Sequence, residues 1–239
     1  MIYFKEYASG IHIFQEKRKS GAESSYICQE TTSIDTKMAI YYHGSSMLFD
    51  TFDLSHALEG DGKAKYGYGV YVTEAYASAA HYAHNKKRPE LQDYYVYTME
   101  VPDCLQDNWL SLYKRVPVSA SILARAEEKL KIAFPDEAKA EGIPFRKYLG
   151  NWLTGQRLTV KQMTSTKTID GEKAASAFLL SIGVELIVWP FEWKRPDNGR
   201  NMAVLDDRQV RILRIDQVDL DPTKNYALIP GSERLVKEF

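Results

Sequence analysis

The hydrophobic and polar positions of this chain predict short strands more often than helices. Short runs rich in β-branched and aromatic residues, each bounded by glycine, proline or aspartate, are typical of strands. We therefore expect strands at residues 38–44, 70–74, 93–101, 184–189, 202–207 and 209–216.

Helical spacing of apolar residues occurs in other segments. We expect helices at residues 75–86, 119–134, 144–156 and 170–183. Ser119 or Ser121 can cap the second of these helices, and an acidic first turn and the terminal Gly183 delimit the last one. Because the helices do not alternate regularly with the strands, the pattern predicts an α+β fold and not a doubly wound sheet.

Two parts of the chain differ in character. Residues 1–36 predict a hairpin that turns at Ser9–Gly10, followed by a polar linker. Residues 37–239 carry the sharper pattern and form the expected main domain, with a helical insert around residues 103–170. The aromatic helices of this insert either complete the core, which is the interpretation we favour, or form a cover or a target-docking element.

Composition narrows the choice of partners. The 239 residues are 44% apolar and 26% charged, as in an ordinary globular protein. The formal net charge of −1 argues against a surface built to grip a nucleic-acid backbone. Cys28 and Cys104 have neither the spacing of a disulfide framework nor that of a zinc site, so we expect no metal and a reducing compartment.

No membrane association is expected. The most apolar stretch, residues 174–193, is interrupted by Glu185 and Pro190, so it cannot span a bilayer as one helix. The first residues show no signal peptide. We therefore expect a cytoplasmic protein, or one that is delivered into a target cell by a leaderless route.

The candidate chemistry is concentrated between residues 41 and 84, which hold four of the five histidines and seven tyrosines. His43 and Gly44 end an expected strand, so an imidazole lies beside a backbone that has no Cβ. Such a backbone can offer its N–H and C=O closely to a planar amide. Taken alone, these residues also fit an ordinary histidine near a turn.

Two tyrosines stand on successive elements, Tyr71 on an expected strand and Tyr82 on the helix that follows. Their rings could clamp a flat ligand, and a cationic ring would gain about 0.5–2 kcal/mol from them. Gly67 and Gly69 lack the spacing of a phosphate-binding loop, so by themselves they indicate only a tight entry into the strand. Core tyrosines are common, so a structural role is the alternative for both rings.

Taken in order, these segments resemble a known family. His43-Gly44-Ser45, the run GYGVYVTE at residues 67–74 and the run ASAAHYA at residues 77–83 are similar to the NAD-binding core of diphtheria-toxin/PARP-type ADP-ribosyltransferases. The pattern is most similar to the ADP-ribosyltransferase-like domains of phage and mobile-element polyvalent proteins. The resemblance covers residues 39–213 and is loose over residues 101–172.

The resemblance implies a fold and a set of roles. It implies split antiparallel β-sheets with flanking helices. His43 would bond a hydroxyl of the adenosine-side ribose, and Gly44 would pair its backbone with the nicotinamide carboxamide. Tyr71 and Tyr82 would sandwich the nicotinamide ring, while Ser45 would contact a ribose or a phosphate. A serine that PARP-type enzymes carry three residues before the second tyrosine is replaced here by Ala79.

The third position of the family's His-Tyr-Glu triad departs from the pattern. The alignment of the closing strand at residues 199–213 places Asn201 where active members carry glutamate. Cleavage of the nicotinamide–ribose bond develops positive charge on the ribose, as in glycoside cleavage. A carboxylate about 4 Å away contributes roughly 4 kcal/mol at an effective dielectric near 20, which is on the order of a thousandfold in rate.

Asn201 could keep the hydroxyl contact but not the full charge. Glu74, Glu185 and Glu192 could replace the missing carboxylate only if the fold brings one of them to the ribose.

The resemblance therefore predicts an enzyme that uses NAD as a substrate, releases nicotinamide and transfers ADP-ribose to a macromolecular acceptor. We favour a protein over a nucleic acid as the acceptor, and the setting of a bacterial or phage toxin, a defence protein or a host-modifying factor. A cognate antitoxin or a neighbouring domain is a further candidate partner. Two alternatives stay open: a degenerate domain that binds NAD, ADP-ribose or a protein without turnover, and an unrelated α+β domain whose tyrosines and glycines are structural.

Overall fold

The computed structural model describes one unit, Lys37–Phe239, with gaps at residues 58–63, 86–87, 89 and 106. The expected hairpin and linker of residues 1–36 lie outside the described residues.

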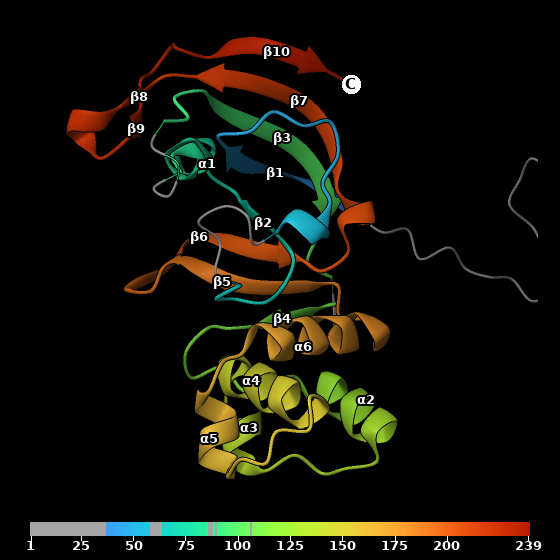
Figure 1. The fold of residues 1–239 in the computed structure, drawn as a ribbon. Helices are drawn as coiled ribbons and strands as arrows, with labels where there is room; N and C mark the ends of the chain where they lie inside the picture. The colour runs from blue at the N-terminus through green and yellow to red at the C-terminus, as the bar shows by residue number, and fades with distance from the viewer. Residues whose placement is uncertain (1–36, 58–63, 86–87, 89, 106) are drawn as a thin grey trace, which may run out of the picture. The chain divides into compact units, whose positions relative to one another are not determined.

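The unit is built on an eight-stranded sheet with the strand order β10-β7-β3-β1-β2-β6-β5-β4 (Figure 1). All neighbours are antiparallel except β4 and β5, which are parallel, so the sheet is mixed and not purely antiparallel as expected. The strands are β1 (Met38–Ser45), β2 (Val70–Thr73), β3 (Tyr94–Pro102), β4 (Trp109–Ser111), β5 (Leu186–Glu192), β6 (Arg195–Val204), β7 (Arg211–Val218) and β10 (Arg234–Glu238). A separate small sheet joins β8 (Leu220–Asp221) and β9 (Ala227–Leu228).

The large sheet divides at the junction of β1 and β2. β1 is paired with β3 over eight positions, from Met38 opposite Pro102 to Ser45 opposite Tyr95. Its register with β2 consists of a single pair, Tyr42 opposite Thr73. We call β10, β7, β3 and β1 the upper half-sheet and β2, β6, β5 and β4 the lower half-sheet, after their places in Figure 1.

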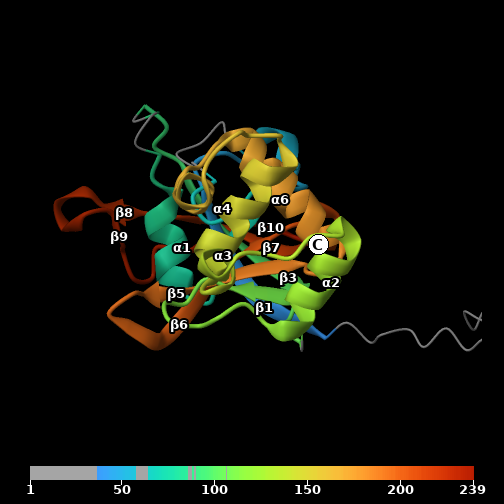
Figure 2. The same ribbon diagram turned by 90° about the horizontal axis from the view of Figure 1, so that it is seen from below.

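Helices cover the two half-sheets differently. The helix α1 (Tyr76–Ala83) packs on β1 and β3 of the upper half-sheet. The other helices gather as one layer beside β4 and β5, and the view from below shows them in front of the strands (Figure 2). They are α2 (Ala120–Leu130), α3 (Asp136–Lys139), α4 (Gly142–Leu153), α5 (Val160–Ser165) and α6 (Ile169–Ser181). None of the helices in the described part of the chain is long and apolar enough to cross a membrane.

Local chemistry sets the ends of these helices. The Thr168 side chain accepts a hydrogen bond from the Gly171 amide at the start of α6, and Thr159 with Gln162 forms a capping box at α5. Ser119 precedes α2, as expected, but its hydroxyl donates to Asp107 and makes no cap bond. The helix then ends at Leu130, because Lys131 adopts the left-handed conformation.

The helical layer and the lower half-sheet share the largest hydrophobic cluster. Phe145 and Leu149 of α4 and Leu179 of α6 pack there with Ile187 and Ala203 from the strands. The opposite face of the sheet carries a second cluster, and α1 covers a third. The insert around residues 103–170 therefore contributes to the core, in agreement with the interpretation that we favoured. The expected α+β class is also confirmed.

Candidate functional site

A row of directly opposed residues crosses the junction of the half-sheets. Tyr42 on β1 lies opposite Thr73 on β2, Thr73 lies opposite Asn201 on β6, and Asn201 lies opposite Trp189 on β5. Opposed residues of paired strands present their side chains on the same face. The register therefore places the expected strands of the site side by side, with Asn201 between Thr73 and Trp189.

His43 joins the two half-sheets through its side chain. Its Nδ1 lies 2.7 Å from the backbone carbonyl oxygen of Tyr71. Because a carbonyl oxygen can only accept, Nδ1 carries the proton, and Nε2 of the neutral ring keeps its lone pair. The ring lies between Phe49, Phe52 and Tyr97, and burial lowers its pKa. A neutral His43 can thus accept a hydrogen bond at Nε2, as from a ribose hydroxyl.

The side chain of Tyr71 is held within the protein. Its hydroxyl donates to the Gly67 carbonyl at 2.9 Å and accepts from the Tyr66 amide at 2.8 Å. Its ring meets Trp189 edge to face, with 5.1 Å between the centroids. Burial raises the pKa of this phenol to about 12, so the hydroxyl is neutral near pH 7. These contacts fix the ring, so a nicotinamide could stack only on the part of its face that Trp189 does not cover.

The segment Ala64–Gly69 forms the entry into β2 and packs against the helical layer. The ring of Tyr66 stacks on Trp189 at a centroid distance of 4.5 Å, and the Tyr68 amide donates to the Ser176 hydroxyl of α6 at 2.9 Å. Gly67 has a φ of +117°, and a Cβ there would lie 2.5 Å from Ile187 Cδ1. The glycine-rich run is therefore the tight entry that its pattern indicated.

Gly44 lies under α1. A Cβ at this position would lie 1.7 Å from the backbone oxygen of Ala79, so only glycine allows α1 to approach β1 this closely. Tyr82, near the end of the same helix, is 65% exposed and makes an edge contact with His81. Ser45 accepts a hydrogen bond from the Met47 amide.

The two expected nicotinamide-binding rings are not brought together. Tyr71 packs toward the helical layer, whereas Tyr82 lies on the surface of α1. Among the described residues, no ring contact joins the two tyrosines. The sandwich of these two tyrosines stays a prediction, and forming it requires at least one of the rings to change its position.

Asn201 is close to the expected site but almost closed off. It is 7% exposed and its neighbour Thr73 is 4% exposed. An open groove of about 680 Å³, lined in part by Phe52, Asp207 and Arg211, includes none of the expected site residues. Little of Asn201 is therefore accessible to a ligand in this structure.

The three glutamates that could replace the triad carboxylate are engaged elsewhere. Glu74 binds Arg200 through its side chain and accepts from the Tyr41 hydroxyl, on the face opposite to Thr73. The other two are Glu185, which is held by Asn108 and Gln209, and Glu192, which pairs with Arg195 in the β5–β6 hairpin.

A buried ion pair in the helical layer was not anticipated. Arg146 of α4 and Glu172 of α6 are in direct contact, with side chains 0% and 2% exposed. The sequence indicated only an acidic first turn that contains Glu172 and a helix that contains Arg146. No sequence motif links charges 26 positions apart, so only their common position on the core faces of α4 and α6 could have indicated the pair.

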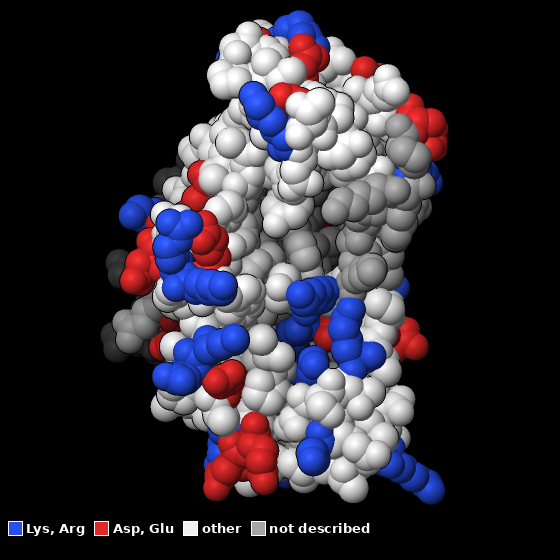
Figure 3. Space-filling view, turned by 90° about the vertical axis from the view of Figure 1, so that its left-hand side faces the viewer, with Lys and Arg blue, Asp and Glu red and all other residues white. Residues whose placement is uncertain are grey.

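Basic side chains lie near the entry into β2. The Lys65 ammonium lies 5.1 Å from the ring centroid of Tyr66, and the Lys173 ammonium lies 5.1 Å from that of Tyr68. Figure 3 shows lysine and arginine side chains around and below a hollow on the left-hand side of the molecule as seen in Figure 1, with aspartate and glutamate side chains among them. The two lysines are therefore cationic groups available near the entry into β2.

Comparison with known proteins identifies no relative: no protein-family model, curated protein or solved structure matches this chain. Residues and geometry alone therefore support any function assigned to the site.

Proposed function

We propose that this protein is an NAD-dependent ADP-ribosyltransferase with the split-sheet fold of that family. It binds NAD⁺ where β1, β2 and β6 meet, releases nicotinamide and transfers ADP-ribose to a macromolecular acceptor. A protein acceptor is favoured over a nucleic acid, and the setting is that of a bacterial or phage toxin, defence protein or host-modifying factor. A cognate antitoxin or a neighbouring domain is a further candidate partner.

One observation carries the proposal: the contact of His43 with Tyr71 at the junction of the half-sheets. The three expected triad positions lie on strands that are neighbours in space, although Asn201 is 130 positions from Tyr71 in the sequence. The imidazole bonds the Tyr71 carbonyl at 2.7 Å, next to the single residue pair that joins β1 to β2. The division of the sheet at this point agrees with the split sheet that the resemblance implies.

The resemblance assigns a role to each residue, and parts of the geometry support these roles. Nε2 of the neutral His43 accepts a hydrogen bond from a ribose hydroxyl. Tyr71 lends its ring to the nicotinamide, since its hydroxyl is already bonded within the protein. Asn201 offers an amide to the second ribose in place of the carboxylate. Lys65 and Lys173, whose ammonium groups lie over the rings of Tyr66 and Tyr68, are candidates to bind the pyrophosphate.

Incubation with NAD⁺ labelled in its adenylate part tests transfer, and chromatography measures free nicotinamide in the same samples. The proposal expects label on an acceptor in a host lysate, or on the protein itself. A Tyr82→Ala variant should lose labelling, whereas His81→Ala on the same helix should keep it. Absence of both label and nicotinamide at high protein concentration would refute turnover.

A second candidate function is binding of NAD⁺ or ADP-ribose without turnover. Two observations favour it: the triad position is Asn201, which is 7% exposed, and all three alternative glutamates are engaged elsewhere. Calorimetric titration with NAD⁺ separates the candidates, because the second expects heat of binding without nicotinamide release. No binding of NAD⁺ or of ADP-ribose would leave the unrelated α+β domain as the remaining interpretation.

A further inference from the structure

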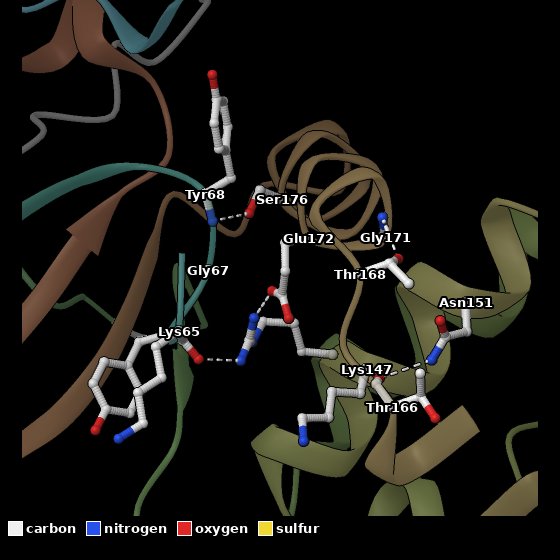
Figure 4. A network of polar contacts seen from close by, with 12 residues as sticks. Lys65, Gly67, Tyr68, Lys147, Asn151, Thr166, Thr168, Gly171, Glu172 and Ser176 are labelled. Atoms are coloured by element: carbon white, nitrogen blue, oxygen red, sulfur yellow. Dashed lines mark hydrogen bonds and ion pairs between the residues drawn. The ribbon is translucent and has the colours of Figure 1, made fainter. Parts of the chain in front are cut away.

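The buried pair of the helical layer reaches beyond its own helices. Arg146 contacts Glu172 through Nη1, and its Nη2 donates to the backbone carbonyl of Lys65 at 3.0 Å (Figure 4). Lys65 belongs to the segment Ala64–Gly69, which leads into β2 and lies 81 positions away from Arg146 in the sequence. One guanidinium thus connects α4, α6 and the entry into β2.

A pair that only joined α4 to α6 would need no third partner. Burial of two charges is costly, and apolar side chains of similar volume often stabilise a core at least as well. A guanidinium, however, has five donors in a fixed fork, so it can neutralise a carboxylate and hold a backbone carbonyl at the same time. The bond to the Lys65 carbonyl is the part of this arrangement that apolar residues could not supply.

The residues that follow Lys65 carry the restraint to Tyr71. The Tyr66 amide donates to the Tyr71 hydroxyl at 2.8 Å, and that hydroxyl donates to the Gly67 carbonyl at 2.9 Å. The Tyr68 amide donates to Ser176, four residues after Glu172 on α6. Residues 65 to 68 are therefore held at each position, either by the helical layer or by Tyr71.

We infer that Arg146, with Glu172 as its counter-ion, is a positioning residue that fixes the segment Ala64–Gly69 and, through it, the ring of Tyr71. The helical layer then determines where the ring of Tyr71 lies beside the junction of the half-sheets. Its effect on NAD⁺ affinity rests on the proposed function, whereas its effect on the segment does not.

The double variant Arg146→Met/Glu172→Met removes both charges and keeps an apolar filling of the core. The single variant Arg146→Met is not suitable, because it would leave Glu172 charged, buried and unpaired. A second variant, Arg146→Lys, keeps the charge next to Glu172 but lacks the fork that reaches the Lys65 carbonyl. The matched control is Lys147→Met, because Lys147 lies on the same helix and bonds the Ser165 carbonyl instead.

Hydrogen exchange of the Tyr66 and Tyr68 amides, followed by NMR, reads out the segment directly, because these amides donate to Tyr71 and Ser176. A positioning role expects both amides to exchange about tenfold faster in the double variant and in Arg146→Lys, which corresponds to the loss of one charged hydrogen bond. Amides in the middle of β3 should keep their rates, and Lys147→Met should match the wild type throughout.

Calorimetry with NAD⁺ on the same samples separates this inference from the proposed function. If the wild type binds NAD⁺, the double variant should bind it about tenfold more weakly while remaining folded. If the wild type does not bind NAD⁺, the proposed function fails, and faster exchange at Tyr66 and Tyr68 still supports positioning. Unchanged exchange at both amides in either variant would overturn the inference, whatever the calorimetry shows.

Discussion

His43 bonds the backbone carbonyl of Tyr71, with 2.7 Å between Nδ1 and the carbonyl oxygen, where the upper and lower half-sheets separate. A side chain thus serves here in place of a main-chain bond between β1 and β2. The strands can diverge at this point without leaving that carbonyl unpaired, which would be costly in a buried position. The divergence is what makes a site between the half-sheets feasible.

The pH dependence of stability should report on this imidazole. Burial lowers the pKa of His43 in the folded protein, whereas in the unfolded chain it titrates near 6.5. The unfolded state therefore binds the proton more readily. The free energy of unfolding should be unaffected above about pH 6.5 and should fall below it, by at most about 1.4 kcal/mol per pH unit, until the folded-state pKa is reached.

Urea unfolding of the wild type and of His43→Gln at pH 7.5, 6.5 and 5.5 measures this effect. The glutamine variant lacks the titrating group, so the stability gap between the two proteins should shrink as the pH falls. A gap that stays constant over this range would mean that His43 does not titrate differently in the two states.

The Tyr71 hydroxyl should contribute to stability through the segment that it holds. Tyr71→Phe leaves the Tyr66 amide and the Gly67 carbonyl without their partner, so we expect a loss of about 2 kcal/mol in the free energy of unfolding. Tyr82→Phe is the matched control, since that residue is 65% exposed and should change stability by less than about 0.5 kcal/mol. Equal urea midpoints for the two variants would contradict the assignment.

Gly44→Ala should push α1 away from β1. The added Cβ would lie 1.7 Å from the Ala79 oxygen and 2.7 Å from the Ala83 nitrogen, and both are backbone atoms that cannot rotate away. We expect thermal unfolding to show a loss of about 3 kcal/mol or more, as for overpacking of a rigid contact. Ser45→Ala, one residue further along β1, should cost less than about 1 kcal/mol, because it removes only an exposed bond to Met47.

Asn201→Glu should raise the rate of NAD⁺ cleavage if the proposed function holds. A carboxylate at this position would lie on the face shared with Thr73 and would stabilise charge on the ribose, so we expect at least a tenfold increase in nicotinamide release. The same change should reduce stability by about 1–3 kcal/mol, because Asn201 is buried. Asn201→Gln has the same size without the charge and should show no increase. A fall in activity for the glutamate variant alone would mean that the asparagine has a role of its own.

Long periodic elements were predictable, and short or polar ones were not. The helix expected at residues 170–183 is α6, Ile169–Ser181, and the strand expected at residues 93–101 is β3, Tyr94–Pro102. The short α3, α5 and β4 were missed, because a few residues carry too little periodicity to be distinguished from a loop. β6 begins at Arg195 and not near residue 202, since the polar first half of the strand belongs to a hairpin with exposed residues.

For the site, the sequence by itself determined which residue types stand at the strand ends: an imidazole beside a glycine, a tyrosine after a glycine-rich run and an asparagine in a closing strand. Only the tertiary structure decided that His43 bonds the Tyr71 carbonyl, that the Tyr71 hydroxyl turns inward and that Arg146 meets Glu172. Local patterns report the period and ends of each element. Contacts between residues far apart in the chain depend instead on strand register and helix packing, which the whole core sets together.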